Sequence, residues 1–238
     1  MIFFSDFDGT LTADHHQMTP TFFEILNLVN RNDHEFIIVS GRSVSWGHFL
    51  LTHFPIRHCI MEGGGVLLTK QDPHKIEQEL LVHKNHVSKL KQFTEKLELR
   101  FPDLALSADS FGRLTDRAIE YHHMEDHMIE EVTQFMNTED ISFSQSNVHI
   151  NFWSGPISKY KGVKDFLKRK RPSVSMHDCW YFGDAPNDES MFENFPNCVG
   201  VSNINRCLDR LKSHPRIILE GVENEGDQGV LNFIKTLI

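Results

Sequence analysis

The sequence predicts an α/β protein, in which a parallel sheet with helices on both faces is interrupted by a small inserted α+β lobe. Short apolar runs alternate with amphipathic segments, which is the pattern of a parallel sheet covered by helices. The chain between Arg42 and Lys161 is far too long for one crossover helix, and this interruption of the rhythm indicates the second lobe.

The elements of the first part follow this alternation. Thr19 and Pro20 supply an N-cap and a first-turn proline for a helix whose apolar residues recur at helical spacing. The stretch between Asp8 and the second strand has room for one helix and for no inserted lobe. Strands are expected at 1–6, 35–40, 56–60 and 66–68, with a tight turn at 62–65.

The inserted lobe is expected at 82–155, between core segments 1–81 and 156–238. Its predicted order is α-β-β-α-β-β, with a helix at 83–99, strands at 104–108 and 115–121, a helix at 125–137, and strands at 141–145 and 148–153. The core then continues with a helix at 161–170, a strand at 178–183, a helix from Asn187, a strand at 198–201, a helix at 205–212, a strand at 216–219 and a helix from 228.

Composition and charge limit the possible functions. A formal net charge of -9 over 238 residues argues against a nucleic-acid binder. No apolar stretch approaches the roughly 20 residues that span a bilayer. The apolar start lacks the basic region and cleavage site of a signal peptide and resembles a first strand. We therefore expect a cytoplasmic protein with no membrane or nucleic-acid partner.

The spacing of cysteine and histidine residues does not indicate a metal site. The four cysteines show no C-x-x-C spacing and mostly lie in apolar strands, as core thiols do. His15-His16 and His122-His123 lack the i, i+4 spacing of a helical site, so surface histidines are the simpler interpretation.

The first strand ends in a pair of carboxylates. Asp6 and Asp8 are separated by one residue, so on a strand both side chains point the same way. Two carboxylates that close repel each other and need a cation or a shared proton between them. Gly9 then allows a sharp turn. This arrangement is expected of a Mg²⁺ site with a carboxylate nucleophile, although a solvated acidic turn would use the same residues.

Three later segments place polar residues at the ends of expected elements. Ser40–Arg42 follows the second strand, Lys159 and Lys161 lie near the start of a helix, and 183–188 is an acidic turn. Each has a simpler explanation, as a strand-to-helix turn, a solvated lysine or a helix cap. Ligands of parallel sheets bind beyond the carboxyl ends of the strands. The residues that fall there are Asp6, Asp8, Ser40 and Asp184.

These segments occur in order and resemble the motifs of the haloacid dehalogenase (HAD) superfamily of phosphotransferases. The start of the chain resembles D-x-D-G-T-[LV], and Ser40–Arg42 resembles the frequent S-G-R form. Residues 157–163 resemble a K-G-x-A-L segment, and 183–188 resemble the acidic G-D-x-x-N-D turn. The resemblance implies a Rossmann-like core with a C2-type cap in its C2B form. Glu62-Gly63-Gly64 resembles the E-N-G-[AG] turn of that subgroup, with Gly63 in place of asparagine.

The resemblance also implies roles for single residues. Asp6 would be the nucleophile, Asp8 the general acid and base, and Ser40 a donor to the phosphoryl group. Lys161 is the better match for the catalytic lysine because it directly precedes a glycine, and Lys159 stays open as the alternative. The implied ligands of Mg²⁺ are Asp6, the backbone carbonyl of Asp8 and Asp184, with Asp188 acting directly or through water.

Substrate contacts are the least defined part of the predicted site. The candidates for substrate binding are Gly41, Arg42, Arg113 and Arg117. For the two arginines of the lobe, exposed ion pairs are the alternative interpretation. Strand alternation within 148–153 puts His149, Asn151 and Trp153 on one face, where Trp153 either stacks on a sugar or packs against protein.

The function class also follows from the resemblance. The subgroup is similar to sucrose-phosphate, trehalose-phosphate and mannosylphosphoglycerate phosphatases. We therefore expect a Mg²⁺-dependent phosphatase of small phosphorylated metabolites, with sugar or polyol phosphates as substrates, acting as a monomer or homodimer. A phosphosugar mutase similar to eukaryotic phosphomannomutases and a non-catalytic sugar-phosphate sensor are the alternatives. The presence of both Asp6 and Asp8 argues against the sensor.

Overall fold

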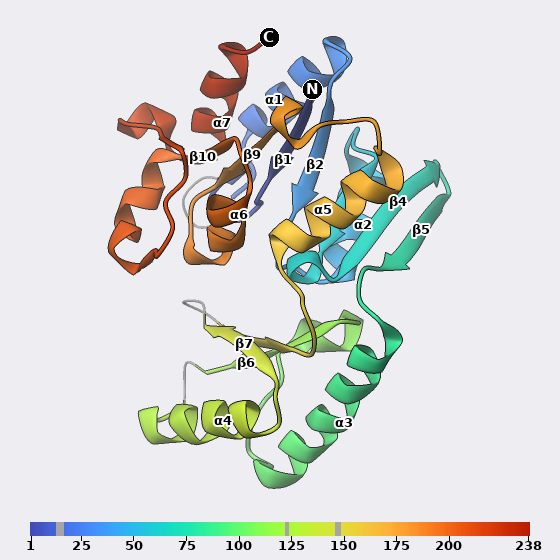
Figure 1. Cartoon of the computed structure of the whole chain (residues 1–238), viewed down its shortest axis with the longest axis vertical. Coiled ribbons are helices and arrows are strands. Elements are labelled where there is room, and N and C mark those ends of the chain that lie inside the picture. Colours follow the sequence, from blue (N-terminus) through green and yellow to red (C-terminus); the bar gives the residue numbers. More distant parts are fainter. Residues whose placement is uncertain (13–16, 122–123, 146–148) are drawn as a thin grey trace.

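The computed structural model describes residues 1–12, 17–121, 124–145 and 149–238, which form two stacked lobes (Figure 1). One lobe contains an eight-stranded sheet and the other a three-stranded sheet, which confirms the predicted α/β fold with an inserted α+β lobe. The division at 81–82 and 155–156 stays a prediction. The pairs His15-His16 and His122-His123 lie outside the described residues.

The larger sheet is parallel at its centre and antiparallel at one edge. Its strands are β1 (Ile2–Ser5), β2 (Glu35–Val39), β3 (His58–Met61), β4 (Val66–Asp72), β5 (Lys75–Leu80), β9 (Cys179–Gly183), β10 (Cys198–Gly200) and β11 (Ile217–Ile218). Their order is β11-β10-β9-β1-β2-β3-β4-β5, with antiparallel pairing of β3 with β4 and of β4 with β5. Strand β1 therefore lies between β9 and β2, in parallel register with both.

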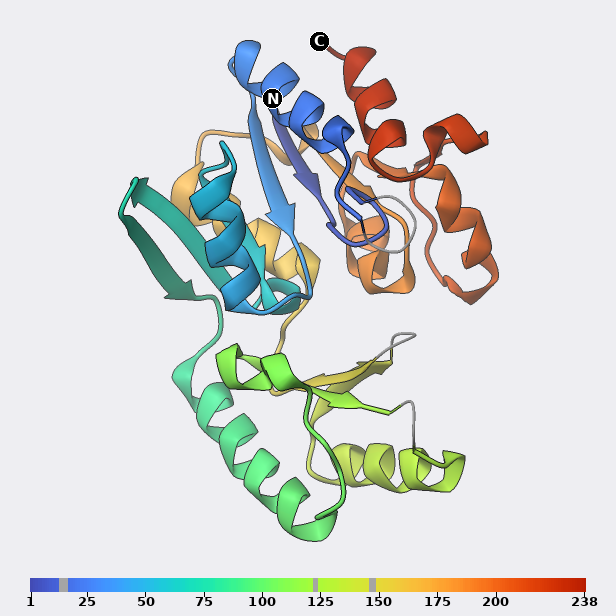
Figure 2. The same cartoon turned by 180° about the vertical axis from the view of Figure 1, so that it is seen from behind.

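Helices cover both faces of this sheet. Helices α1 (Pro20–Arg31), α2 (Val44–His53) and α7 (Gly226–Lys235) lie on the face seen in Figure 2, and α5 (Lys159–Lys170) and α6 (Glu189–Asn194) on the opposite face, seen in Figure 1. Thr19 caps α1 as predicted, because its hydroxyl oxygen accepts a hydrogen bond from the Thr21 amide at 3.1 Å. Across the described ranges, none of the helices has the length and apolar character that crossing a bilayer requires.

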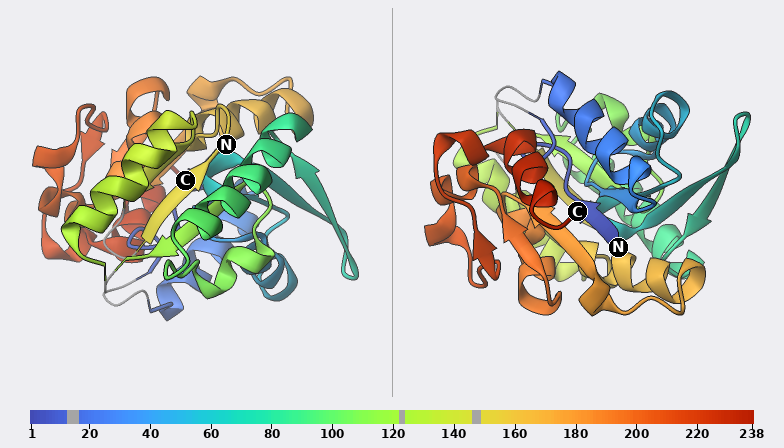
Figure 3. Two further views of the ribbon diagram at one scale, coloured as in Figure 1. Left: turned by 90° about the horizontal axis from the view of Figure 1, so that it is seen from below. Right: turned by 90° about the horizontal axis from the view of Figure 1, so that it is seen from above.

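The smaller lobe, called the cap below, is a layer of helices under a layer of strands. It contains α3 (Lys84–Arg100), β6 (Asp116–Glu120), α4 (Asp126–Thr138), β7 (Ser142–Gln145) and β8 (His149–Trp153), in an antiparallel sheet of order β6-β8-β7. Ile119, Ile150 and Phe152 are buried in a cluster with side chains of α3 and α4. The strands lie between these helices and the larger lobe, so the other face of the cap sheet is turned towards the core (Figures 1 and 3).

The strand expected at 104–108 is absent from the described cap. Leu106 makes only an isolated bridge to Ile119, and the chain then turns through a short 3-10 helix at Ala108–Gly112. The bridge has two backbone hydrogen bonds, from the Ser107 amide to the Ala118 carbonyl and from the Glu120 amide to the Ala105 carbonyl, and the Ser110 hydroxyl also bonds the Ala118 backbone. The pairing stops after this one bridge because the chain turns into the 3-10 helix, where a serine side chain bonds β6 instead of the backbone, and the observed order is α-β-α-β-β.

The core also differs from the sequence prediction in several elements. The helix expected at 205–212 is two 3-10 segments, Ser202–Arg206 and Leu208–Arg210, because the Ser202 and Asn203 side chains bond to backbone groups of neighbouring loops. Helix α2 and strand β5 were not predicted from the sequence. Strand β5 is polar and half-exposed, so it lacks the apolar alternation that identifies a strand.

Candidate active site

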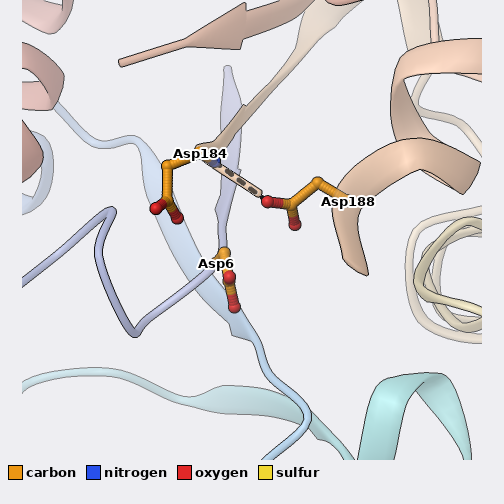
Figure 4. Close-up of side chains that lie close together, drawn as sticks. All are labelled: Asp6, Asp184 and Asp188. Carbon is orange, nitrogen blue, oxygen red and sulfur yellow. Dashed lines mark hydrogen bonds between the residues drawn. The ribbon is translucent and has the colours of Figure 1, made fainter. Parts of the chain in front are cut away.

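Three carboxylates meet at the carboxyl end of the central strands. Asp6 follows β1, Asp184 follows β9, and Asp188 lies in the turn before α6, and one oxygen from each lies within 4.8 Å of the others (Figure 4). Asp6 and Asp188 are buried, with 2% and 0% of their surface exposed. The predicted grouping of Asp6 with the late acidic turn is therefore present in the structure.

Strand register and a glycine bring these groups together. Ser5 is paired with Phe182, so β1 and β9 end side by side, and the Asp6 amide donates to the Phe182 carbonyl at 2.9 Å. Gly9 has a φ of 82°, and a Cβ on it would overlap the Asp184 carboxylate. Only glycine fits at this turn, because both the backbone conformation and the nearby carboxylate exclude a side chain.

Lys159 is the cation of the cluster. Its ammonium lies 2.8 Å from Asp6 Oδ1 and 2.6 Å from Asp188 Oδ1, and the side chain is 3% exposed. Burial opposes the charged form, but the Asp188 and Asp6 carboxylates outweigh it and raise the Lys159 pKa above its usual range. The buried Tyr181 hydroxyl donates to the same Asp188 oxygen, which fixes that carboxylate in place.

The structure corrects the preferred assignment of the lysine. The Lys161 ammonium lies 2.6 Å from Asp165 Oδ2 and donates to the Leu81 carbonyl at 3.3 Å, with a third of the side chain exposed. Residues i and i+2 of a helix point to different sides, so only one of the two lysines can face Asp6. Lys159 is that residue because Ser158 caps α5 and makes Lys159 its first residue, next to the strand ends.

The acidic cluster is short of positive charge. Burial raises the pKa of Asp6 to about 7, Asp188 acts in the same direction, and Lys159 opposes both. Burial and the neighbouring carboxylates also raise the pKa of Asp184 well above its usual range. Among the described residues, buried Asp6 Oδ2 has no hydrogen-bond partner. An unsatisfied carboxylate oxygen beside further acidic oxygens is the environment that a hard divalent cation fits.

Two residues orient Asp184, and neither was singled out from the sequence. The Thr10 hydroxyl donates to Asp184 Oδ1 at 2.8 Å, and the Asn203 amide donates to Asp184 Oδ2 and to the Gly9 carbonyl, both at 3.0 Å. Asn203 also accepts the Gly226 amide. Thr10 is the threonine of the D-x-D-G-T-[LV] motif, so the motif could have marked it. Asn203 is distant in sequence and polar like many loop residues, so no pattern marks it.

Arg42 binds the second aspartate of the first motif. Its Nε lies 2.8 Å and its Nη2 2.6 Å from the two oxygens of Asp8, and its guanidinium stacks over the Trp46 ring at 4.5 Å. A bidentate guanidinium fixes both the position and the plane of a carboxylate. Arg42 was expected to contact substrate, whereas the structure pairs its guanidinium with Asp8.

Ser40 and Gly41 lie in the loop between β2 and α2. Ser40 is 1% exposed, and its hydroxyl oxygen accepts the Arg42 amide at 3.1 Å. A Cβ on Gly41 would meet no atom within 4 Å, so this face of the loop borders open space. The loop therefore follows the strand next to β1 and leaves room above Gly41, as the predicted roles of both residues require.

The two cap arginines contact protein rather than open space. Arg113 is 5% exposed, and its guanidinium is shared between Asp109, Asp116 and the Gly41 carbonyl. Arg117 donates to the carbonyls of Arg113 and Asp116, and by strand alternation it lies on the helix-covered face with Ile119. Direct substrate contact is therefore not what the geometry assigns to either residue.

Comparisons with known proteins identify the family and the fold. The model of the haloacid dehalogenase-like hydrolases matches residues 3–111 and 107–234. A search of curated proteins found no significant match. Among solved structures, a haloacid dehalogenase-like hydrolase from B. subtilis has 15% identity and a TM-score of 0.72, covering 100% of this chain and 99% of its own.

Two further structures are named as phosphatases. A HAD-superfamily phosphatase from Bacteroides thetaiotaomicron has 15% identity and a TM-score of 0.70, with 99% of this chain and 94% of that chain covered. The C-terminal domain of trehalose-6-phosphate phosphatase from C. albicans has 16% identity and a TM-score of 0.68, with coverages of 99% and 91%. These identities establish similarity of fold, while the family model covers nearly the whole sequence. The chain therefore belongs to the haloacid dehalogenase-like hydrolase family.

Proposed function

We propose that this hydrolase is a Mg²⁺-dependent phosphatase that releases inorganic phosphate from small phosphomonoesters through a phosphoryl group carried on Asp6. The observation that carries the proposal is the environment of Asp6. One of its oxygens is held by Lys159, while the other is buried and has no hydrogen-bond partner among the described residues, and the Asp184 and Asp188 carboxylates lie close to Asp6. The names of two structural neighbours as phosphatases support the same class of reaction.

Hydrolases of this family generally use a divalent metal, and the acidic cluster fits one. Asp6 and Asp184 would hold it, with the Asp8 carbonyl and Asp188 as the further ligands implied by the resemblance. We propose Mg²⁺ because all these ligands are oxygens, which this ion prefers. When bound, the ion neutralises the charge between the carboxylates and a phosphate dianion.

The side chains of Asp6 and its neighbours would carry out the remaining steps of the reaction. An Asp6 oxygen attacks phosphorus, and the bond from phosphorus to the ester oxygen breaks. Asp8 gives its proton to the departing alkoxide and then takes one from the water that hydrolyses the acyl phosphate. Lys159 and Ser40 stabilise negative charge on the transferring group. Asp6 is regenerated, so atoms and charge balance over the cycle.

The cap sheet supports a polyol or sugar as the leaving group. Strand alternation puts the polar side chains of Ser142, Ser144, Asn151 and Trp153 on the sheet face turned towards the core (Figure 1). Asn151 and Trp153 are partly exposed there. Hydroxyl and amide groups beside an indole ring are suited to binding sugar hydroxyls and stacking on a sugar ring.

A screen of phosphorylated metabolites tests the proposal. With Mg²⁺, the enzyme should release inorganic phosphate, and kcat/KM should be highest for a sugar or polyol phosphate. Release should stop with EDTA and return with added Mg²⁺. An isomeric sugar phosphate formed in place of inorganic phosphate would instead identify a mutase. Equal, metal-independent rates on every ester would contradict the proposal.

Metal binding is expected to stabilise the fold more at alkaline than at acidic pH. Mg²⁺ at 100 times its dissociation constant should add about 2.7 kcal/mol to the free energy of unfolding. At a fixed Mg²⁺ concentration the gain should be larger near pH 8 than near pH 5.5, because Asp6, with its pKa raised to about 7, must lose its proton before binding metal. Thermal unfolding measures this shift. Asp184→Asn should reduce it, whereas exposed Asp178→Asn should leave it unchanged.

Arg42 is expected to act on turnover rather than on phosphate binding. Arg42→Ala removes the two bonds that position Asp8, so kcat should fall by about 10- to 100-fold while KM changes little. Steady-state kinetics separates the two parameters. Arg57→Ala, at an exposed arginine, is the control. A rise in KM with unchanged kcat would return Arg42 to the substrate-binding role.

A further inference from the structure

The turn at Glu62–Gly64 lies where the core loop, helix α5 and the cap meet. The Glu62 amide donates to the Arg42 carbonyl at 3.0 Å, and the Gly63 amide donates to the Ser40 carbonyl at 3.0 Å. Gly64 has a φ of 111° and packs so closely on Ser158 that a Cβ would overlap the Ser158 carbonyl. The turn therefore touches both the loop that contains Ser40 and the start of the helix that carries Lys159.

The Glu62 side chain crosses from the core to the cap. Its carboxylate accepts the Leu114 amide at 3.0 Å, the Thr115 amide at 2.6 Å and the Thr115 hydroxyl at 2.7 Å. Glu62 is 1% exposed and has a φ of 54°, an uncommon conformation for a residue other than glycine. Such a backbone persists where the surrounding contacts hold it, and here the core loop binds the Glu62 amide while the cap binds its side chain.

A second contact from the cap reaches the same loop. Arg113 precedes the two residues that bind Glu62, and its Nη1 donates to the Gly41 carbonyl at 3.0 Å. Three successive carbonyls of the loop therefore accept hydrogen bonds. The Ser40 and Arg42 carbonyls accept from the amides of the turn, and the Gly41 carbonyl between them accepts from the Arg113 guanidinium of the cap. The loop is therefore held by the turn, whose Glu62 side chain is bound by the cap, and by Arg113 of the cap itself.

We propose that Glu62 is a positioning residue: by binding Leu114 and Thr115 it docks the cap on the loop Ser40–Arg42 and so sets that loop for the reaction. The role in turnover rests on the proposed function. The physical reason is that the donors to Glu62 are two amides and a hydroxyl, all from the cap. A buried carboxylate without these donors is costly, and water can replace them only if the cap moves away.

Hydrogen exchange of Glu62→Gln tests the docking directly. The carboxamide has one acceptor oxygen, so its NH₂ group must face an amide or hydroxyl donor. Exchange of the Leu114 and Thr115 amides should accelerate by at least about tenfold, while the Ile119 amide within β6 keeps its protection. The matched control is Glu35→Gln, which alters a core ion pair with Arg171 that makes no cap contact. Unchanged exchange in Glu62→Gln would overturn the proposal.

Kinetics of the same variants test the link to the reaction. Glu62→Gln should raise KM for the preferred phosphate ester and lower kcat/KM by at least about tenfold, and Glu35→Gln should change neither. Faster exchange with unchanged kinetics would overturn the positioning role. Hydrogen exchange needs no substrate, so an absence of phosphatase activity in the unmodified enzyme would refute the proposed function and leave the docking result valid.

A second variant covers the case in which Glu62→Gln does not fold. Thr115→Val removes the hydroxyl that donates to Glu62 and keeps a branched side chain of similar volume. Thr115→Val should also accelerate hydrogen exchange of the Leu114 and Thr115 amides, by a smaller factor than Glu62→Gln. No shift in this variant would count against Glu62 as the group that holds the cap.

Discussion

Phosphate release by Asp6→Asn is expected to fall at least about 10³-fold, because an amide oxygen cannot take the place of the carboxylate nucleophile. The loss should appear in kcat rather than in KM. Rapid quenching of the unmodified enzyme with substrate, followed by mass spectrometry, should find the phosphoryl group on Asp6. Asp33→Asn is the matched control, because Asp33 is exposed and its φ of 55° also suits asparagine.

The same substitution should change how stability depends on pH. The pKa of Asp6 is raised to about 7, so between about pH 4 and pH 7 the folded protein holds a proton that the unfolded chain has released. In the metal-free protein, this group therefore lowers the free energy of unfolding as pH rises through that window. Asp6→Asn should lack this part of the decline, as denaturant unfolding at several pH values would show. Full activity in Asp6→Asn would contradict the mechanism.

Lys159→Met and Lys161→Met are expected to differ sharply. Lys159→Met leaves Asp6 and Asp188 without their shared cation in a buried site, so the free energy of unfolding should fall by about 3–5 kcal/mol. Its kcat/KM should fall by about 10³-fold. Lys161→Met removes a partly exposed pair with Asp165 and should cost less than about 0.5 kcal/mol, with activity retained.

Denaturant unfolding and steady-state kinetics of the two variants decide between the lysines. Added Mg²⁺ should recover part of the stability of Lys159→Met, because the ion neutralises the same carboxylates, and none of its activity. An inactive Lys161→Met beside an active Lys159→Met would reverse the assignment made from the geometry.

The sequence was most informative where function depends on strand ends. Asp6 and Asp184 were expected near each other because each lies at the carboxyl end of a strand of one parallel sheet, and the structure brings them together. Lys159 and Lys161 could not be separated in this way, because the choice depends on the residue at which α5 begins. That residue is set by the Ser158 cap and by close packing against Gly64.

Local sequence patterns could not predict side-chain contacts between segments that are far apart in the sequence. Two such contacts are the ion pair of Arg42 with Asp8 and the hydrogen bond from Thr115 to Glu62. Both depend on the geometry of loops, which hydrophobic periodicity does not predict. The strand expected at 104–108 failed for a related reason. Residues 105–107 pair with β6 through a single bridge, but the 3-10 turn at Ala108–Gly112 ends this pairing, and the Ser110 hydroxyl then bonds the Ala118 backbone.

The two ends of the larger sheet affect how copies of this protein can meet. Strand β5 ends one side with the exposed charges of Lys75 and Glu77, and β11 ends the other side after only two residues. Charged or very short terminal strands discourage a second chain from extending the sheet through its backbone. Growth into continuous β-ribbons is therefore disfavoured at both borders, and any pairing of copies has to rely on side-chain surfaces.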